Sequence, residues 1–318
     1  MSTLPERTPM TTLTGVVPPV LTPLTAEGEV DRPSLERLVT RMIEAGVDGL
    51  FALGSSSETV YFDDLRRTQV LETISGVAAG QVPVLAGVIE PQLDRVLTQV
   101  RVAERVGAAG VVATAPFYAV TGPDEVEAHF RGIAAATDLP VWAYDIPVCT
   151  HYKLGPELLV RLGSEGVLAG VKDSSGDDVS FRRLAMQNRA AGERLTLLTG
   201  HEVVVDGSYL AGAHGSVPGL GNVEPAGYVR MDRAARAGDW AAVRAEQDRL
   251  AALFEIVFVP RDKVGPAAGI GAFKTALRHL GVIDTNVVAR PMVALGDEHA
   301  RRIAEICEAA GLEPLARA

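Results

Sequence analysis

The sequence predicts an α/β protein built as a (β/α)8 barrel, or TIM barrel, with a helical extension at its C-terminal end. Eight short apolar runs alternate with longer segments of helical period, which favours parallel βαβ units. Over most of the chain these runs recur about 28 residues apart, the length of one strand, one helix and two loops. After Pro225 the pattern is helical only.

The predicted strands are short runs rich in Val, Leu and Ala. They are Val16-Val17, Gly49–Leu53, Val82–Val88, Gly110–Ala113, Val141–Tyr144, Leu168–Val171, Leu195–Leu198 and Gly215–Val217. Eight such runs match the strand number of a closed barrel.

Helix signals stand between the strands. Asp31-Arg32-Pro33 places an N-cap residue ahead of a proline that the first helical turn tolerates, and Gly46 ends the apolar pattern that follows. Further helix starts are expected at Pro123-Asp124, Gly155-Pro156 and Asp177-Asp178, and C-terminal helices near 226–258, 266–280 and 290–311. We therefore expect an N-terminal tail over 1–14, a barrel over 15–224 and C-terminal helices packed on it over 225–318.

Composition narrows the class of partner. Of the 318 residues, 47% are hydrophobic, enough for a large core, and 30 Lys and Arg face 40 Asp and Glu, a net charge of −10. This balance disfavours nucleic acid and anionic membranes as partners. Two cysteines, Cys149 and Cys307, cannot build a disulfide framework, and no secretory signal or membrane span is evident. We expect a cytoplasmic protein.

Polar residues that directly follow the strands are the candidate active site, because barrel enzymes bind their substrates at the carboxyl ends of the strands. Lys172 is one of only four lysines and closes an apolar strand. A desolvated lysine loses its proton more easily, and its neutral amine attacks ketones to form a Schiff base. The alternative is a lysine that extends to the barrel rim or pairs with Asp173.

Two neighbouring features favour the catalytic interpretation. Tyr144 ends the preceding strand, about 4.8 Å from that of Lys172 if the strands are adjacent, so its phenol could serve a proton transfer there. The turn Ser55-Ser56-Ser57 offers backbone N–H groups and hydroxyls that could hold a carboxylate. Alternatively, Tyr144 is a core aromatic and the serines are an ordinary helix cap.

The motifs at the strand ends resemble those of a known family. GSSSE at 54–58, PFY at 116–118, YDIP at 144–147 and GVKDSSG at 170–176 follow one another at spacings similar to those of the pyruvate-dependent class I aldolases, as does the opening segment Gly15–Pro23. This family includes dihydrodipicolinate synthase, N-acetylneuraminate lyase and 2-keto-3-deoxygluconate aldolase. The resemblance extends from Gly15 to about Gly221.

The resemblance implies roles for individual residues. Lys172 would form the Schiff base with pyruvate or another 2-oxo acid, Tyr144 would carry the proton, Ser55 would relay it and Ser56 would bind the carboxylate. Tyr118 matches a tyrosine that such enzymes lend across a subunit interface, which implies a homo-oligomer, a dimer or tetramer. Neither a cofactor nor a metal is needed, and the six histidines show no metal-binding spacing.

Departures from the family patterns narrow the range of possible substrates. Cys149 stands where dihydrodipicolinate synthases carry an arginine for a second carboxylate, and a thiol cannot replace that arginine. In Gly200-His201-Glu202-Val203 one of two acidic positions typical of neuraminate lyases is apolar. Ser57 replaces a usual glycine and Asp145 a usual asparagine. Gly54, Ser57, Gly200, His201, Glu202 and Val217 are further candidate substrate-binding residues, although His201 and Glu202 also suit a helix start.

The sequence therefore predicts an aldolase or lyase that joins or separates pyruvate and an aldehyde, acting on a 2-keto-3-deoxy sugar acid or a related 2-oxo acid. Four alternatives stay open. They are a dihydrodipicolinate synthase, a 2-oxo acid dehydratase of the same family, a non-catalytic barrel that binds a keto acid, and a metal-dependent barrel enzyme.

Overall fold

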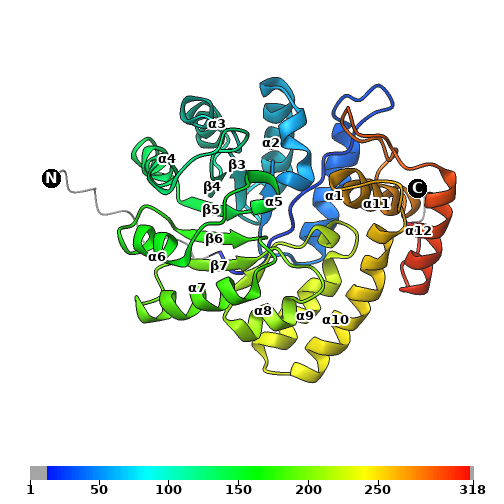
Figure 1. Cartoon of the computed structure of the whole chain (residues 1–318). Coiled ribbons are helices and arrows are strands. Elements are labelled where there is room, and N and C mark those ends of the chain that lie inside the picture. The colour runs from blue at the N-terminus through cyan, green and yellow to red at the C-terminus, as the bar shows by residue number, and fades with distance from the viewer. Residues whose placement is uncertain (1–12, 316–318) are drawn as a thin grey trace.

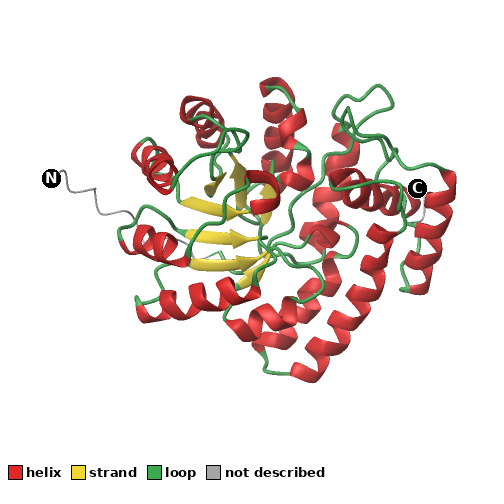
Figure 2. Cartoon of the chain, in the orientation of Figure 1, coloured by secondary structure: helices red, strands yellow, loops and turns green. Residues whose placement is uncertain are grey.

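Eight parallel strands form the centre of the molecule. The computed structural model describes residues 13–315, so most of the expected N-terminal tail lies outside the described residues. The strands are β1 (Gly15–Val16), β2 (Leu50–Ala52), β3 (Val84–Gly87), β4 (Gly110–Thr114), β5 (Val141–Asp145), β6 (Gly170–Asp173), β7 (Thr196–Thr199) and β8 (Gly215–Ser216). They pair in the order β1-β8-β7-β6-β5-β4-β3-β2, and helices surround them (Figure 2).

The sheet closes between β1 and β2. A single bridge joins Pro19 to Phe51, where Phe51 N–H donates to the Pro18 carbonyl and Val20 N–H donates to the Phe51 carbonyl. Together with the β1–β8 pairing, this bridge returns the sheet to its first strand. The predicted (β/α)8 barrel is thereby confirmed.

Helices follow the strands along the chain. They are α1 (Arg32–Glu44), α2 (Asp64–Ala78), α3 (Leu93–Arg105), α4 (Pro123–Ala135), α5 (Pro147–Thr150), α6 (Pro156–Ser164), α7 (Asp178–Ala190), α8 (Val205–Ala211), α9 (Pro225–Arg236), α10 (Trp240–Phe254), α11 (Pro266–His279) and α12 (Asp297–Ala309). The expected cap at Asp31 is confirmed, since its side chain accepts from Ser34 N–H. Asp177 caps α7 in the same way.

The C-terminal part differs in detail from the sequence expectation. The segment expected near 226–258 is two helices, because the chain turns at Gly238 with φ +75°, a conformation that favours glycine. The helix expected over 290–311 begins only at Asp297. Helix α9, which the expected boundary at 224 places in the extension, follows β8 and packs on β1, in the position of the eighth barrel helix. Figure 1 shows α10, α11 and α12 grouped on one side of the barrel.

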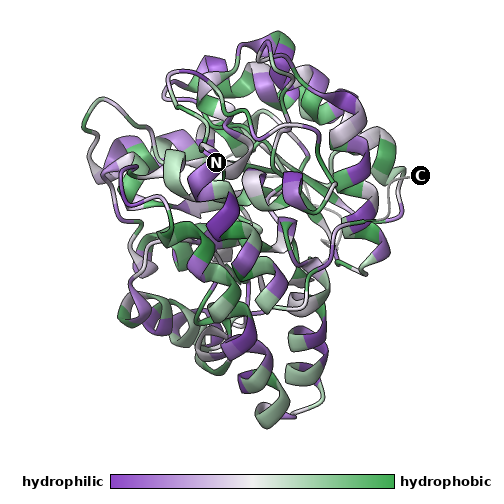
Figure 3. Cartoon of the chain, turned by 90° about the vertical axis from the view of Figure 1, so that its right-hand side faces the viewer, coloured by the Kyte–Doolittle hydropathy of each residue, from purple (hydrophilic) through white to green (hydrophobic). Residues whose placement is uncertain are grey.

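The apolar core has two main parts and one small satellite cluster of Leu24, Phe62 and Ala289. Phe51, Val112, Trp142, Tyr144 and Leu198 belong to a cluster inside the barrel, while a larger cluster fills the space between the strands and the helices. This division follows from the strand geometry, in which successive side chains point to opposite faces. Along the helices, hydrophobic and hydrophilic residues alternate (Figure 3). In residues 13–315 no helix is both long enough and apolar enough to span a membrane.

Candidate active site

The register of β5 and β6 places Tyr144 directly beside Lys172 at the carboxyl ends of the strands. The Lys172 side chain enters the barrel, where the residue is only 5% exposed. Its Nζ lies 4.0 Å from the centre of the Tyr144 ring and 5.0 Å from that of the Phe51 ring. Two aromatic faces therefore surround the amine at the mouth of the barrel.

Lys172 differs from the other three lysines in its partners. Lys153 donates to Asp145, Lys274 donates to Glu58, and Lys263 donates to Asp262 at 2.8 Å. Among the described residues, Lys172 makes no ion pair with a carboxylate, so pairing with Asp173 is not observed. A buried amine without a counter-ion is available for chemistry on a carbonyl group.

The serine turn after β2 approaches the same place. Ser55 Oγ and the Tyr144 hydroxyl share a hydrogen bond of 3.3 Å, and Ser56 is half-buried beside Ser55. Gly54 permits this approach, because a Cβ there would lie 2.6 Å from the Phe51 ring. The Phe51 ring in turn meets that of Tyr144 edge to face, with 6.0 Å between centroids. Phe51 is a site residue that the sequence analysis missed.

Ser57 points into the protein interior and away from this hydroxyl pair. It is fully buried, its hydroxyl donates to the Val20 carbonyl, and its own carbonyl accepts from Thr22 Oγ1 at 3.0 Å. The Ser57 hydroxyl thus fastens the turn to the segment after β1. The expectation that Ser57 binds substrate is not supported by this position.

A buried ion pair supports the turn from below. Glu58 has φ +62° and its carboxylate accepts from Lys274 Nζ on α11 and from Ala289 N–H, the latter at 2.6 Å. Both side chains of the pair are completely buried. The C-terminal extension therefore takes part in holding the serine turn, which its separation in sequence from the turn did not reveal.

The loop after β7 brings further polar groups to the strand ends. Gly200 N–H donates to the Asp173 carbonyl at 2.6 Å, and a Cβ at Gly200 would lie 1.9 Å from Ser174 Oγ, so a larger residue there would displace the Ser174 side chain. His201 Nε2 lies 3.4 Å from an Asp178 carboxylate oxygen. His201 is half-buried, and its contact with Asp178 places it near the start of α7, at the edge of the site.

Glu202 carries a perturbed carboxyl group. Burial raises its pKa to about 7, while N–H groups of Leu220 and Gly219 and the charge of Lys172 act in the opposite direction. Leu220 N–H donates directly to the carboxylate. A carboxyl group with this pKa can accept or donate a proton near neutral pH. Val217 contributes only a buried apolar wall to the cluster inside the barrel.

Tyr118 and Cys149 lie on the loops after β4 and β5. Tyr118 is 98% exposed within the single chain and has φ +75°, an uncommon conformation for a residue with a side chain. Cys149 is exposed, yet desolvation of its thiol raises its pKa, and the charge of Lys172 partly opposes this. Cys149 therefore lies close enough to Lys172 for that residue's charge to act on its thiol.

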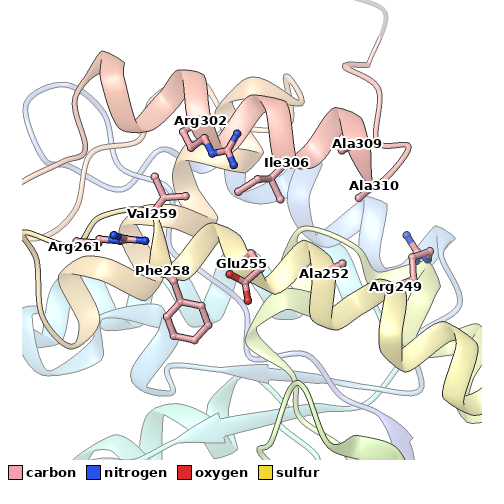
Figure 4. Close-up of a pocket in the computed structure, with 10 residues that line it drawn as sticks. All are labelled: Arg249, Ala252, Glu255, Phe258, Val259, Arg261, Arg302, Ile306, Ala309 and Ala310. Atoms are coloured by element: carbon pink, nitrogen blue, oxygen red, sulfur yellow. The ribbon is translucent and has the colours of Figure 1, made fainter.

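A separate groove of about 520 Å³ lies between α10, the 3-10 turn Glu255–Phe258 and α12. Arg249, Glu255 and Arg302 are among its lining residues (Figure 4). None of the sequence-predicted site residues lines it. Within residues 13–315, no three His, Cys, Asp or Glu side chains form a group that could hold a metal ion.

Comparison with known proteins identifies the family. The model of the dihydrodipicolinate synthetase family matches residues 12–310. A 4-hydroxy-tetrahydrodipicolinate synthase of Phenylobacterium zucineum is 32% identical over 84% of this chain and 87% of its own, and an uncharacterized DapA-like lyase of Halobacterium salinarum is 36% identical over 74% and 76%. YagE of E. coli K12, a prophage protein of the dihydrodipicolinic acid synthase family solved in complex with pyruvate, superposes with a TM-score of 0.88 at 26% identity, covering 94% and 99%. The chain therefore belongs to the dihydrodipicolinate synthetase family and is a lyase of the class I aldolase type.

Proposed function

We propose that this enzyme forms a Schiff base between Lys172 and pyruvate, or another 2-oxo acid, and uses it to make or break a carbon–carbon bond to an aldehyde. The observation that carries this proposal is the environment of the Lys172 amine. It is buried, it lies over the Tyr144 and Phe51 rings, and it is the one lysine of four without a carboxylate partner among the described residues.

The chemistry needs an amine and a route for protons. The Lys172 amine attacks the ketone carbon of pyruvate, and loss of one water from the carbinolamine leaves a protonated imine. Because the imine withdraws electrons, the methyl group loses a proton to give an enamine, whose carbon adds to the aldehyde carbonyl. The new alkoxide takes one proton, and water hydrolyses the imine to release the product and the free amine.

Tyr144 and Ser55 are suited to this proton transfer. The phenol lies beside the amine, and its bond of 3.3 Å to Ser55 Oγ begins a hydroxyl relay. Tyr118 would continue the relay in a neighbouring copy of the chain, since its ring projects away from its own subunit. The proposed enzyme is accordingly a homo-oligomer, a dimer or a tetramer, and the 2-oxo acid carboxylate binds at Ser56.

The substrate preference rests on this chain's own residues. At Cys149 the site lacks the arginine that would bind a second carboxylate, whereas His201 and Glu202 place hydrogen-bonding groups at the edge of the site. We propose a 2-keto-3-deoxy sugar acid or a related 2-oxo acid as substrate. A panel of such acids assayed for pyruvate release tests this preference.

Reductive trapping tests the Schiff base itself. Borohydride added with pyruvate should leave one covalent mass increment, located on Lys172 by peptide mass spectrometry. Lys172→Ala should lose the adduct, and Lys263→Ala, which removes a lysine paired with Asp262, should retain it. An adduct on another lysine, or no adduct at all, contradicts the proposal. Stabilisation by pyruvate without a reducible adduct would instead favour a non-catalytic keto-acid-binding barrel.

A second candidate is 4-hydroxy-tetrahydrodipicolinate synthase, the name that the bacterial relative carries. The two candidates share the imine and differ in the aldehyde. Formation of 4-hydroxy-tetrahydrodipicolinate at a rate above that of pyruvate release from every sugar acid tested would establish the synthase. It would also show that Cys149 does not exclude a substrate with a second carboxylate.

A further inference from the structure

Three charged side chains lie directly behind the Tyr144–Lys172 pair. Asp145 and Asp173 follow these two residues in β5 and β6 and occupy paired positions in the ladder, as Tyr144 and Lys172 do. Because successive strand residues point to opposite faces, the two carboxylates lie on the outer side of the barrel wall. Asp145 is fully buried and Asp173 is nearly so.

Lys153 lies between the two carboxylates. Its Nζ donates to Asp145 Oδ2 and lies 3.8 Å from Asp173 Oδ2, and it also donates to the Leu154 carbonyl at 3.2 Å. Asp145 Oδ1 accepts from Leu154 N–H at 3.1 Å. The segment that carries Lys153 is thus bound to the end of β5, and its ammonium faces the end of β6.

The two carboxylates need this cation. Asp173 Oδ1 accepts from Ser175 N–H and Oγ at 2.8 and 2.7 Å, whereas its Oδ2 has no hydrogen-bond partner among the described residues. Burial raises the pKa of Asp145 to about 6, Lys153 opposes that rise, and the charge of Asp173 adds to it. Without Lys153, two buried anions would stand side by side on adjacent strands, where they repel each other.

We propose that Lys153 is a positioning residue whose ammonium bridges Asp145 and Asp173 and so fixes the spacing between Tyr144 and Lys172. This inference rests on the proposed function, because it concerns the geometry of proton transfer beside the imine. It also accounts for the departure at Asp145. An aspartate in place of the usual asparagine adds a buried negative charge, and Lys153 neutralises it.

The test uses pyruvate alone and needs no aldehyde. In D2O the enzyme should exchange the methyl protons of pyruvate for deuterium through the imine and enamine, which NMR follows directly. Lys153→Met should slow this exchange by about 10- to 100-fold per folded molecule, since small displacements of reacting groups cost rate on this scale. Asp145→Asn combined with Lys153→Met removes one charge of each sign and should recover most of the rate.

A matched control separates positioning from loss of stability. Arg67 and Glu90 form an ion pair of 2.6 Å whose side chains are 6% and 5% exposed, so it is more deeply buried than the 30% exposed Lys153, and it does not touch the strand ends of Tyr144 and Lys172. Arg67→Met should lower the melting temperature and leave exchange per folded molecule unchanged. If Lys153→Met does not fold, Lys153→Gln replaces it with the same expected loss.

The outcomes distinguish the two proposals. A wild-type enzyme that neither traps pyruvate nor exchanges its protons overturns the proposed function. A wild-type enzyme that does both, alongside a Lys153 variant that exchanges at the normal rate, overturns the positioning role alone. The same holds if the double variant is no faster than Lys153→Met.

Discussion

Replacing Tyr144 by phenylalanine isolates the hydroxyl from the ring. The ring that lies 4.0 Å from Lys172 Nζ remains, as does its edge contact with Phe51. The variant loses one hydrogen bond to Ser55, which is long at 3.3 Å, so the free energy of unfolding should fall by only about 0.5–1.5 kcal/mol. Loss of the proton carrier should slow pyruvate methyl exchange in D2O by about 10²–10⁴-fold. That loss corresponds to about 3–5 kcal/mol on the barrier.

The same variant should still form the covalent intermediate. Borohydride trapping at saturating pyruvate should yield the Lys172 adduct in Tyr144→Phe as in the wild type, because the amine and its aromatic surroundings are intact. Tyr209→Phe is the matched control, since it removes the phenol of a half-buried tyrosine that donates to Asp232 at 3.1 Å on the outer helices, and its exchange rate should be normal. Exchange by Tyr144→Phe at the wild-type rate would refute the role of the phenol as proton carrier.

Three further predictions concern stability. Lys274→Met leaves Glu58 buried and unpaired, so urea unfolding should show a loss of about 3–5 kcal/mol, which Glu58→Gln in the same chain should partly restore. Burial lowers the pKa of His129 to about 4, so the unfolded chain binds a proton at this residue before the folded chain does as the pH falls. Up to about 3 kcal/mol of the free energy of unfolding should therefore be lost between pH 6.5 and 4. His129→Gln should remove this pH dependence from the free energy of unfolding measured with urea. Gly200→Ala places a Cβ against Ser174 and should lower the free energy of unfolding by about 1–3 kcal/mol, measured by thermal unfolding. Pyruvate exchange should also become slower. An unchanged melting temperature would show that the loop accommodates the added methyl group without strain.

The sequence by itself determined the barrel and the identity of its central amine. The signals for these elements are local. They are the alternation of strands and helices, the recurrence of apolar runs, and the caps at Asp31 and Asp177, and each can be identified in the sequence before the fold is known. The rarity of lysine drew attention to Lys172, and the same rarity could have drawn it to Lys153. The placement of Tyr144 beside Lys172 followed because consecutive barrel strands are neighbours.

Only the tertiary structure decided which charges meet. Lys274 reaches Glu58 across 216 positions of the sequence, and Ser57 turns its hydroxyl to Val20 instead of the site. Lys153 faces both Asp145 and Asp173 because the loop after β5 folds back over the ends of two strands. Such contacts arise when closure of the barrel brings distant segments together and burial leaves each charge in need of a partner, and no periodic pattern along the chain records which partner that is.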